Sequence, residues 1–134
     1  MRAIQVILPL IALLLVSLLA NADVVLQSCT TTQDIIDAVT DGNSSHYLLF
    51  YDSLDVNSVR VYNTLSVLKT KRTFKIDVFD IREPQSSWLR SSLDIVYAPA
   101  LIYIKWTANR RKVIDAYSSM DFGSAALAQF LQRH

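Results

Sequence analysis

Residues 47–51 read Tyr-Leu-Leu-Phe-Tyr, an unbroken apolar run of strand length. A strand with one face in water alternates apolar and polar side chains, so a run without a polar position is typical of a central strand covered on both faces. Of all features of the sequence, this run limits the fold most, because a sheet covered on both faces needs a further layer on each side. It therefore predicts a layered α/β domain.

Strand and helix patterns alternate along the rest of the chain. Besides the central run, apolar patterns predict strands at residues 24–26, 74–81, 100–106 and 112–116. Capping residues and apolar spacing predict helices at residues 30–39, 56–69, 84–93 and 122–132. The predicted order is βαβαβαββα, which gives a mixed central sheet flanked by helices.

The N-terminal residues have the features of a secretory signal peptide. Arg2 precedes an apolar run at 4–20, and Ala20-Asn21-Ala22 gives the small-x-small pattern of a signal peptidase site. We expect a signal peptide at 1–22 and one domain at 23–134. An uncleaved signal anchor is the alternative, because the apolar run could nearly span a bilayer. No later apolar stretch approaches that length, so we expect a mature protein without stable membrane insertion, secreted or in the endoplasmic reticulum lumen.

Composition argues against several classes of function. The chain has 13 Lys and Arg against 12 Asp and Glu, a net charge of +1, which is not the strong positive field of a nucleic-acid binder. It has 1 Cys and 2 His, too few for a C-x-x-C redox pair, an internal disulfide framework or a cysteine-rich zinc site. We therefore expect no nucleic-acid partner, no metal and no cofactor.

Two stretches resemble the thioredoxin fold, and in particular single domains of the protein disulfide isomerase family. One is the run at 47–51, and the other is Asp-Ile-Val-Tyr-Ala-Pro-Ala-Leu-Ile-Tyr-Ile-Lys at 94–105. The second is similar to the family segment in which a small residue, a cis proline and a strand follow one another. The resemblance extends over nearly all of 23–134. It implies a thioredoxin-like fold with Pro99 in a loop beside the start of the helix that follows 47–51.

The chain departs from this family at the residues that carry redox chemistry. Active members have Trp-Cys-x-x-Cys after the central strand, but here Leu54 replaces the tryptophan, and Asp55 and Ser58 replace the two thiols. Leu49 occupies the position of the family's buried acid. Because disulfide exchange needs a thiolate, the resemblance implies a redox-inactive member and not a dithiol oxidoreductase. Asp55 is expected to cap the following helix, and a cation site shared with Asp52 is the alternative.

The resemblance also implies a peptide groove beside the cis-proline loop. In this fold the loop exposes backbone that can pair with an extended peptide, in the manner of strand addition. The alternative is that Pro99 only shapes the fold. The candidate peptide-binding residues are Tyr51, Leu54, Tyr97, Ala98 and Pro99.

The leading functional hypothesis is a non-enzymatic, redox-inactive protein of the secretory pathway. Its partner is expected to be a polypeptide client or a dedicated protein, bound through the cis-proline groove. One alternative is an oxidoreductase or transferase of the same fold that acts without a C-x-x-C motif. The other is a structural subunit of a larger luminal assembly.

Two further residues bear on an exported protein. Cys29, the lone thiol, is expected to be buried and inert as a small apolar residue. A homodimer or mixed disulfide through Cys29 is the alternative. Asn43 begins the sequence Asn-Ser-Ser in a polar turn, which makes it a glycosylation candidate.

Overall fold

A mixed sheet forms the centre of the computed structural model, which describes residues 22–40, 45–107 and 110–134. Its strands are β1 (Ala22–Ser28), β2 (Ser45–Tyr51), β3 (Lys69–Thr70), β4 (Phe74–Asp80), β5 (Ala100–Thr107) and β6 (Arg110–Ala116). The 6-stranded sheet has the order β3-β1-β4-β2-β5-β6. Asn43 lies outside the described residues, as do residues 1–21 of the predicted signal peptide.

β2 lies inside the sheet, as its apolar run predicts. It pairs in parallel with β4 on one side and antiparallel with β5 on the other. β4 also pairs in parallel with β1, and β5 pairs antiparallel with β6. The side chains of Tyr47, Leu48, Leu49 and Phe50 are all buried. Both faces of this strand are therefore covered, which confirms the predicted central strand.

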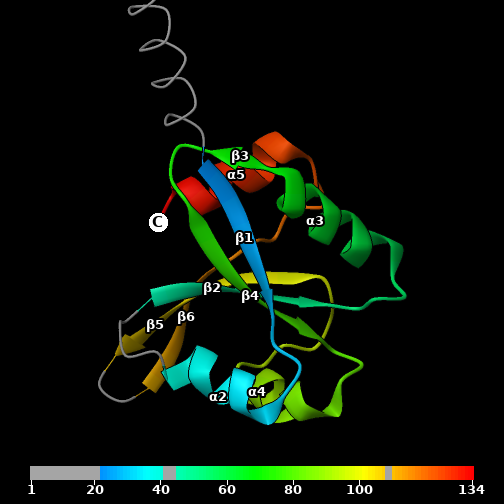
Figure 1. Ribbon diagram of the computed structural model, residues 1–134, viewed down its shortest axis with the longest axis vertical. Coiled ribbons are helices and arrows are strands. Elements are labelled where there is room, and N and C mark those ends of the chain that lie inside the picture. Colours follow the sequence, from blue (N-terminus) through cyan, green and yellow to red (C-terminus); the bar gives the residue numbers. More distant parts are fainter. Residues whose placement is uncertain (1–21, 41–44, 108–109) are drawn as a thin grey trace, which may run out of the picture.

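Helices cover the two faces of the sheet (Figure 1). They are α2 (Thr32–Thr40), α3 (Val56–Val67), the 3₁₀ turn η1 (Pro84–Ser86), α4 (Ser87–Ser92) and α5 (Ser124–Gln132). Leu49 packs in one core cluster with residues of α3 and α5, such as Leu65 and Leu127. Leu48 packs in a second cluster with Ile35 of α2 and Leu89 of α4. This alternation along β2 sends successive side chains to opposite layers and confirms the predicted sheet flanked by helices.

The structure differs from the sequence-based elements at several helix boundaries. The helix predicted at 56–69 ends at Val67, because Leu68 is extended and 69–70 form β3 against Ala22 and Asp23. The observed order therefore contains one short strand that the prediction lacked. The helix predicted from Pro84 begins as a 3₁₀ turn, and the helix predicted at 122–132 begins at Ser124.

The first described residues are part of the sheet. Ala22 pairs with Thr70, whose Oγ1 donates a hydrogen bond to the Ala22 carbonyl at 3.4 Å. Asp23 forms an ion pair with Lys69 of β3. A chain cleaved after Ala22 would lose the first residue of β1 and keep this ion pair. Within the described ranges, no helix is both long and apolar enough to cross a membrane.

Candidate functional site

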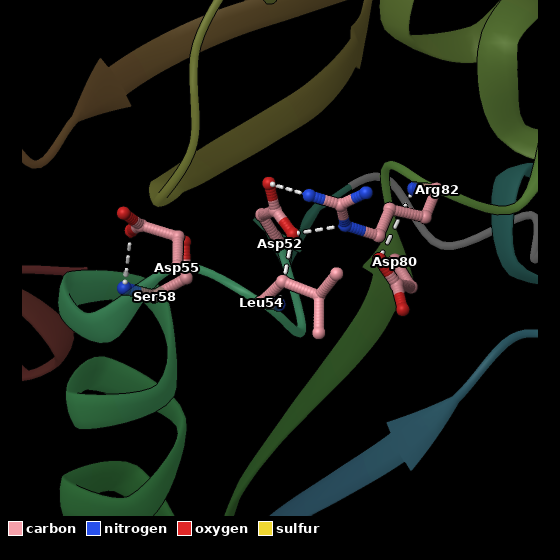
Figure 2. Close-up of polar contacts among 6 residues, drawn as sticks. All are labelled: Asp52, Leu54, Asp55, Ser58, Asp80 and Arg82. Carbon is pink, nitrogen blue, oxygen red and sulfur yellow. Dashed lines mark hydrogen bonds and ion pairs between the residues drawn. The ribbon is translucent and has the colours of Figure 1, made fainter.

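The start of α3 carries Asp55 and Ser58, the two residues that the sequence resemblance sets at the thiol positions. Asp55 is the N-cap of α3, with an extended backbone at φ −98° and ψ 129°. Its Oδ2 accepts a hydrogen bond from the Ser58 backbone N–H at 2.8 Å (Figure 2). Ser58 is fully buried, and its Oγ has no hydrogen-bond partner among the described residues. The predicted cap is therefore confirmed, and neither side chain offers a thiol.

Asp52 is held by an arginine from the next loop. Arg82 donates from Nε to Asp52 Oδ1 at 2.5 Å and from Nη2 to Oδ2 at 3.2 Å (Figure 2). The Leu54 backbone N–H also donates to Asp52 Oδ1, at 2.9 Å. These hydrogen bonds, the one from Arg82 first, hold the pKa of Asp52 below its usual range. Both carboxylate oxygens of Asp52 are thus used inside the protein.

The arrangement of these carboxylates gives no support to a cation site. Asp52 binds Arg82, whereas Asp55 caps α3, so the two carboxylates serve separate partners. In 22–40, 45–107 and 110–134, no group of three His, Cys, Asp or Glu side chains is arranged to hold a metal ion.

The loop before β5 contributes the other half of the site. The Ala98–Pro99 peptide bond is cis. Tyr97 is 67% exposed, and Ala98 and Pro99 are half-buried. These three residues line a cavity of about 330 Å³, near the lower end of the range for ligand pockets. The other lining residues are Asn57, Val61, Leu101, Tyr117, Ser118, Ser119, Met120 and Phe122.

Two of the predicted groove residues do not line this cavity. Tyr51 is half-buried, with its ring 5.3 Å from that of Tyr62 on α3. Burial raises the pKa of the Tyr51 hydroxyl. Leu54 is 74% exposed beside the start of α3. Of the predicted set, the structure brings together Tyr97, Ala98 and Pro99 at the cavity.

The loop between β6 and α5 forms a cavity wall that the sequence analysis missed. Asp121 orders this loop, since its N–H donates to Ser119 Oγ at 3.0 Å and its Oδ1 accepts from Gly123 N at 2.9 Å. Tyr117 donates its hydroxyl to the Asp121 carbonyl. Met120 nevertheless remains 76% exposed. In the sequence, the available signal for this wall was an apolar Met120 among polar residues, outside every predicted helix and strand.

Two exposed apolar side chains, Tyr97 and Met120, line the cavity, and three more lie within a few residues of lining residues in sequence. We call the five together the apolar rim: Leu54, Val56, Val96, Tyr97 and Met120. Single exposed apolar residues are common on protein surfaces, whereas exposed apolar residues that line a cavity are typical of an interaction site. None of the described residues that line the cavity is charged. The geometry suits an apolar ligand group better than an ionic one.

A second cavity lies next to the first. It has a volume of about 230 Å³ and shares Tyr97, Leu101 and Tyr117 with the first cavity. Its remaining walls are Leu93, Asp94, Ile95, Val96, Ala100, Ile102 and Ala116. The two cavities therefore lie on either side of a common wall.

Cys29 lies away from both cavities. It is 4% exposed and packs in the core cluster that contains Ile35 and Leu48. Burial, together with the nearby Asp77 carboxylate, raises the pKa of the Cys29 thiol to about 11. This environment supports the expected inert thiol, because the nucleophilic form of cysteine is the thiolate. A homodimer through Cys29 would require the core around it to open.

Comparisons with known proteins define the class of fold. No family model and no curated protein matches the chain. Thioredoxin O1 from Arabidopsis thaliana, in the oxidized state, matches at 18% identity with a TM-score of 0.57, over 84% of this chain and 97% of that one. Thioredoxin from Trichomonas vaginalis matches at 16% identity and 0.53, over 83% and 97%. A putative oxidoreductase with a thioredoxin fold matches at 11% identity and 0.55, over 78% and 92%.

These identities are low, so the likeness concerns the fold alone. The chain has a thioredoxin-like fold.

Proposed function

We propose that this protein is a redox-inactive thioredoxin-like protein of the secretory pathway that binds polypeptide clients or a dedicated protein partner. The binding site is the cis-proline groove, which we define as the 330 Å³ cavity together with the apolar rim. The observation that carries the proposal is the uncharged cavity beside the cis-proline loop, with exposed apolar residues in the segments that frame it.

The side chains at the start of α3 support a non-enzymatic function. Thiol–disulfide exchange proceeds by attack of a thiolate on a disulfide sulfur. Asp55 and Ser58 cannot perform this attack, and the chain's 1 cysteine is buried elsewhere. The position of the family's buried acid holds Leu49, an apolar core residue. The proposed function is therefore binding without redox chemistry.

The cis-proline loop supports the recognition of an extended backbone. Within the described chain, no hydrogen bond uses the backbone N–H or carbonyl of Ala98. A bound segment can pair with this exposed backbone while one of its apolar side chains enters the cavity. Backbone pairing tolerates many sequences, and the cavity adds a preference for an apolar residue.

The proposed compartment depends on the N-terminal sequence. An apolar run that ends in Ala20-Asn21-Ala22 supports entry into the secretory pathway with cleavage after Ala22. The test is N-terminal sequencing of the protein recovered from the medium and from the endoplasmic reticulum lumen. A chain that begins at Asp23 supports the proposal, and a chain that still begins at Met1 contradicts it.

An arginine placed in the groove tests the binding function. In Ala98→Arg, a bulky cation would cover an uncharged cavity, so we expect the affinity for a reduced and alkylated unfolded polypeptide to fall roughly tenfold or more. The matched control is Ala125→Arg on the exposed surface of α5, which we expect to bind like the parent. Thermal unfolding reports the fold of each variant, and fluorescence anisotropy reports binding. A folded Ala98→Arg variant that binds as tightly as the parent would show that the groove is not the binding surface.

A further inference from the structure

Among the described residues, Asp94 is the only charged one that lines the second cavity. The other walls are apolar or aromatic, and they come from the turn after α4 and from the ends of β5 and β6. A cavity with apolar walls and one carboxylate matches a side chain that has an apolar stem and a cationic head. Lysine and arginine have this form.

The Asp94 carboxylate is available to a ligand. No hydrogen bond or ion pair in the described parts of the chain uses it. Arg90, the nearest basic residue in sequence, has its carbonyl bonded to the Ile95 N–H at 2.9 Å but forms no ion pair with Asp94. This state differs from that of Asp52 and Asp55, whose carboxylates bond within the protein.

The backbone fixes Asp94 at the end of α4. Its φ of 56° lies in the left-handed region, which aspartate and asparagine adopt more readily than most residues. Its N–H donates to the Ser91 carbonyl at 3.2 Å, and the neighbouring Ile95 N–H is bonded as well. The carboxylate therefore extends from an anchored turn.

A single extended ligand can reach both cavities, because Tyr97, Leu101 and Tyr117 line both of them. In the part of the chain that the structure describes, no charged residue lines the first cavity, whereas Asp94 lines the second. We propose that the second cavity is a subsite for a lysine or arginine side chain of the same bound polypeptide. The preferred partner is then an extended segment with an apolar residue and a basic residue close together in sequence. This inference rests on the proposed function.

A set of peptides tests the subsite on the unmodified protein. Each labelled peptide carries one Phe in an otherwise small, uncharged sequence, and Lys, Gln or Glu occupies each neighbouring position in turn. At the best position we expect the Lys peptide to bind about two- to fivefold more tightly than the Gln peptide, since an accessible ion pair contributes modestly. We expect the Glu peptide to bind most weakly. The Lys preference should disappear near 1 M salt, where the Debye length is about 3 Å.

Asp94→Asn removes the charge and keeps a residue suited to the left-handed backbone. We expect this variant to bind the Lys and Gln peptides equally. The matched control is Asp37→Asn on α2, an exposed carboxylate that lines neither cavity and should leave the preference intact. Circular dichroism verifies that both variants fold.

The possible failures are distinguishable. If the unmodified protein binds the Lys, Gln and Glu peptides equally at every position, or if folded Asp94→Asn keeps the preference, the basic subsite is wrong and the groove remains. If no peptide and no unfolded polypeptide binds at all, the proposed function fails and the subsite fails with it.

Discussion

The candidate site consists of two regions with opposite character. The first, which we call the capped region, comprises Asp52, Asp55 and Ser58 with Arg82. Its carboxylates bond to Arg82 and to the backbone of the same segment (Figure 2). The second, the open region, is the cis-proline loop with the β6–α5 loop. It presents exposed Tyr97 and Met120 beside an uncharged cavity.

The two regions differ in whether their groups already have partners within the protein. In the capped region, the carboxylates of Asp52 and Asp55 form their hydrogen bonds within the protein. In the open region, apolar surface and the backbone of Ala98 remain without partners in the described chain. Under the proposed function, this thioredoxin-like fold lacks the residues for exchange and uses the open region to bind a polypeptide.

The largest effect is expected when cysteines replace Asp55 and Ser58 in the capped region, because these substitutions should introduce redox activity. Residues 55 and 58 are the N-cap and the third helical residue of α3, and the Cα atoms of residues three apart on a helix lie about 5 Å apart, a separation that a disulfide can bridge. In a Cys29→Ser background, Asp55→Cys with Ser58→Cys should form an intramolecular disulfide in air, and with dithiothreitol as the reductant it should reduce insulin faster than dithiothreitol alone, whereas the parent should not. The helix N-terminus favours the thiolate of the first cysteine.

The matched controls for this experiment are the two single cysteine variants in the same background. Neither can close an intramolecular bridge, so both should remain inactive. Mass measurement before and after reduction detects the bridge as a loss of two hydrogens. A double variant that folds but never closes the bridge would contradict the proposed correspondence of these positions.

The second prediction concerns the thiol outside both regions. Burial raises the pKa of Cys29 from its ordinary value of 9.0 to about 11. At pH 8 the thiolate fraction should therefore be about a hundredfold lower in the folded protein than in the unfolded chain. Iodoacetamide labelling should be slower by at least that factor in buffer than in urea. Equal rates would show that Cys29 is accessible and would favour the disulfide-linked dimer.

The same pKa shift gives a direction for the pH dependence of stability. The folded protein favours the neutral thiol, so this contribution to the free energy of unfolding is fully present below pH 9.0. It is lost as the pH rises through about 11. Denaturation at several pH values checks the sign, with Cys29→Ser as the comparison that lacks the titrating group.

The smallest expected effect is the loss of one helix cap. Asp55→Ala should lower the free energy of unfolding by about 0.5–2 kcal/mol, because the Ser58 N–H loses its acceptor. Asp55→Asn retains a capping side chain and should unfold close to the parent. Urea denaturation with and without divalent ions measures both variants. A cation-dependent stability that Asp55→Ala abolishes would revive the cation-site hypothesis.

Local sequence patterns predicted the elements whose determinants are local. The buried β2 follows from the unbroken run at 47–51, and the α3 cap follows from an aspartate at a helix start. The early end of α3 could not be predicted in this way, because β3 forms only through its pairing with Ala22 and Asp23. That pairing joins residues far apart in sequence.

Contacts between residues far apart in sequence also explain which residues of the candidate site were not predicted. Tyr97 and Ala98 were found because they adjoin a recognisable proline, and both line the cavity. Met120 was missed because the fold alone brings its loop to the groove. The partner of Asp52 was missed for the same reason, since Arg82 lies 30 residues further along the chain. Contacts of this kind depend on topology, which residue periodicity does not encode.

The ion pair between Asp52 and Arg82 has a consequence for how readily the proposed partner would bind. It joins the loop after β2 to the loop after β4, and the Arg82 N–H also bonds Asp80 Oδ1 at 3.1 Å. The segment that contains Leu54 is therefore held by hydrogen bonds within the protein, and ordering a flexible segment is one of the main entropic costs of binding. Under the proposed function, a partner that contacts this segment would not bear that cost, and its association would not wait for the segment to fold.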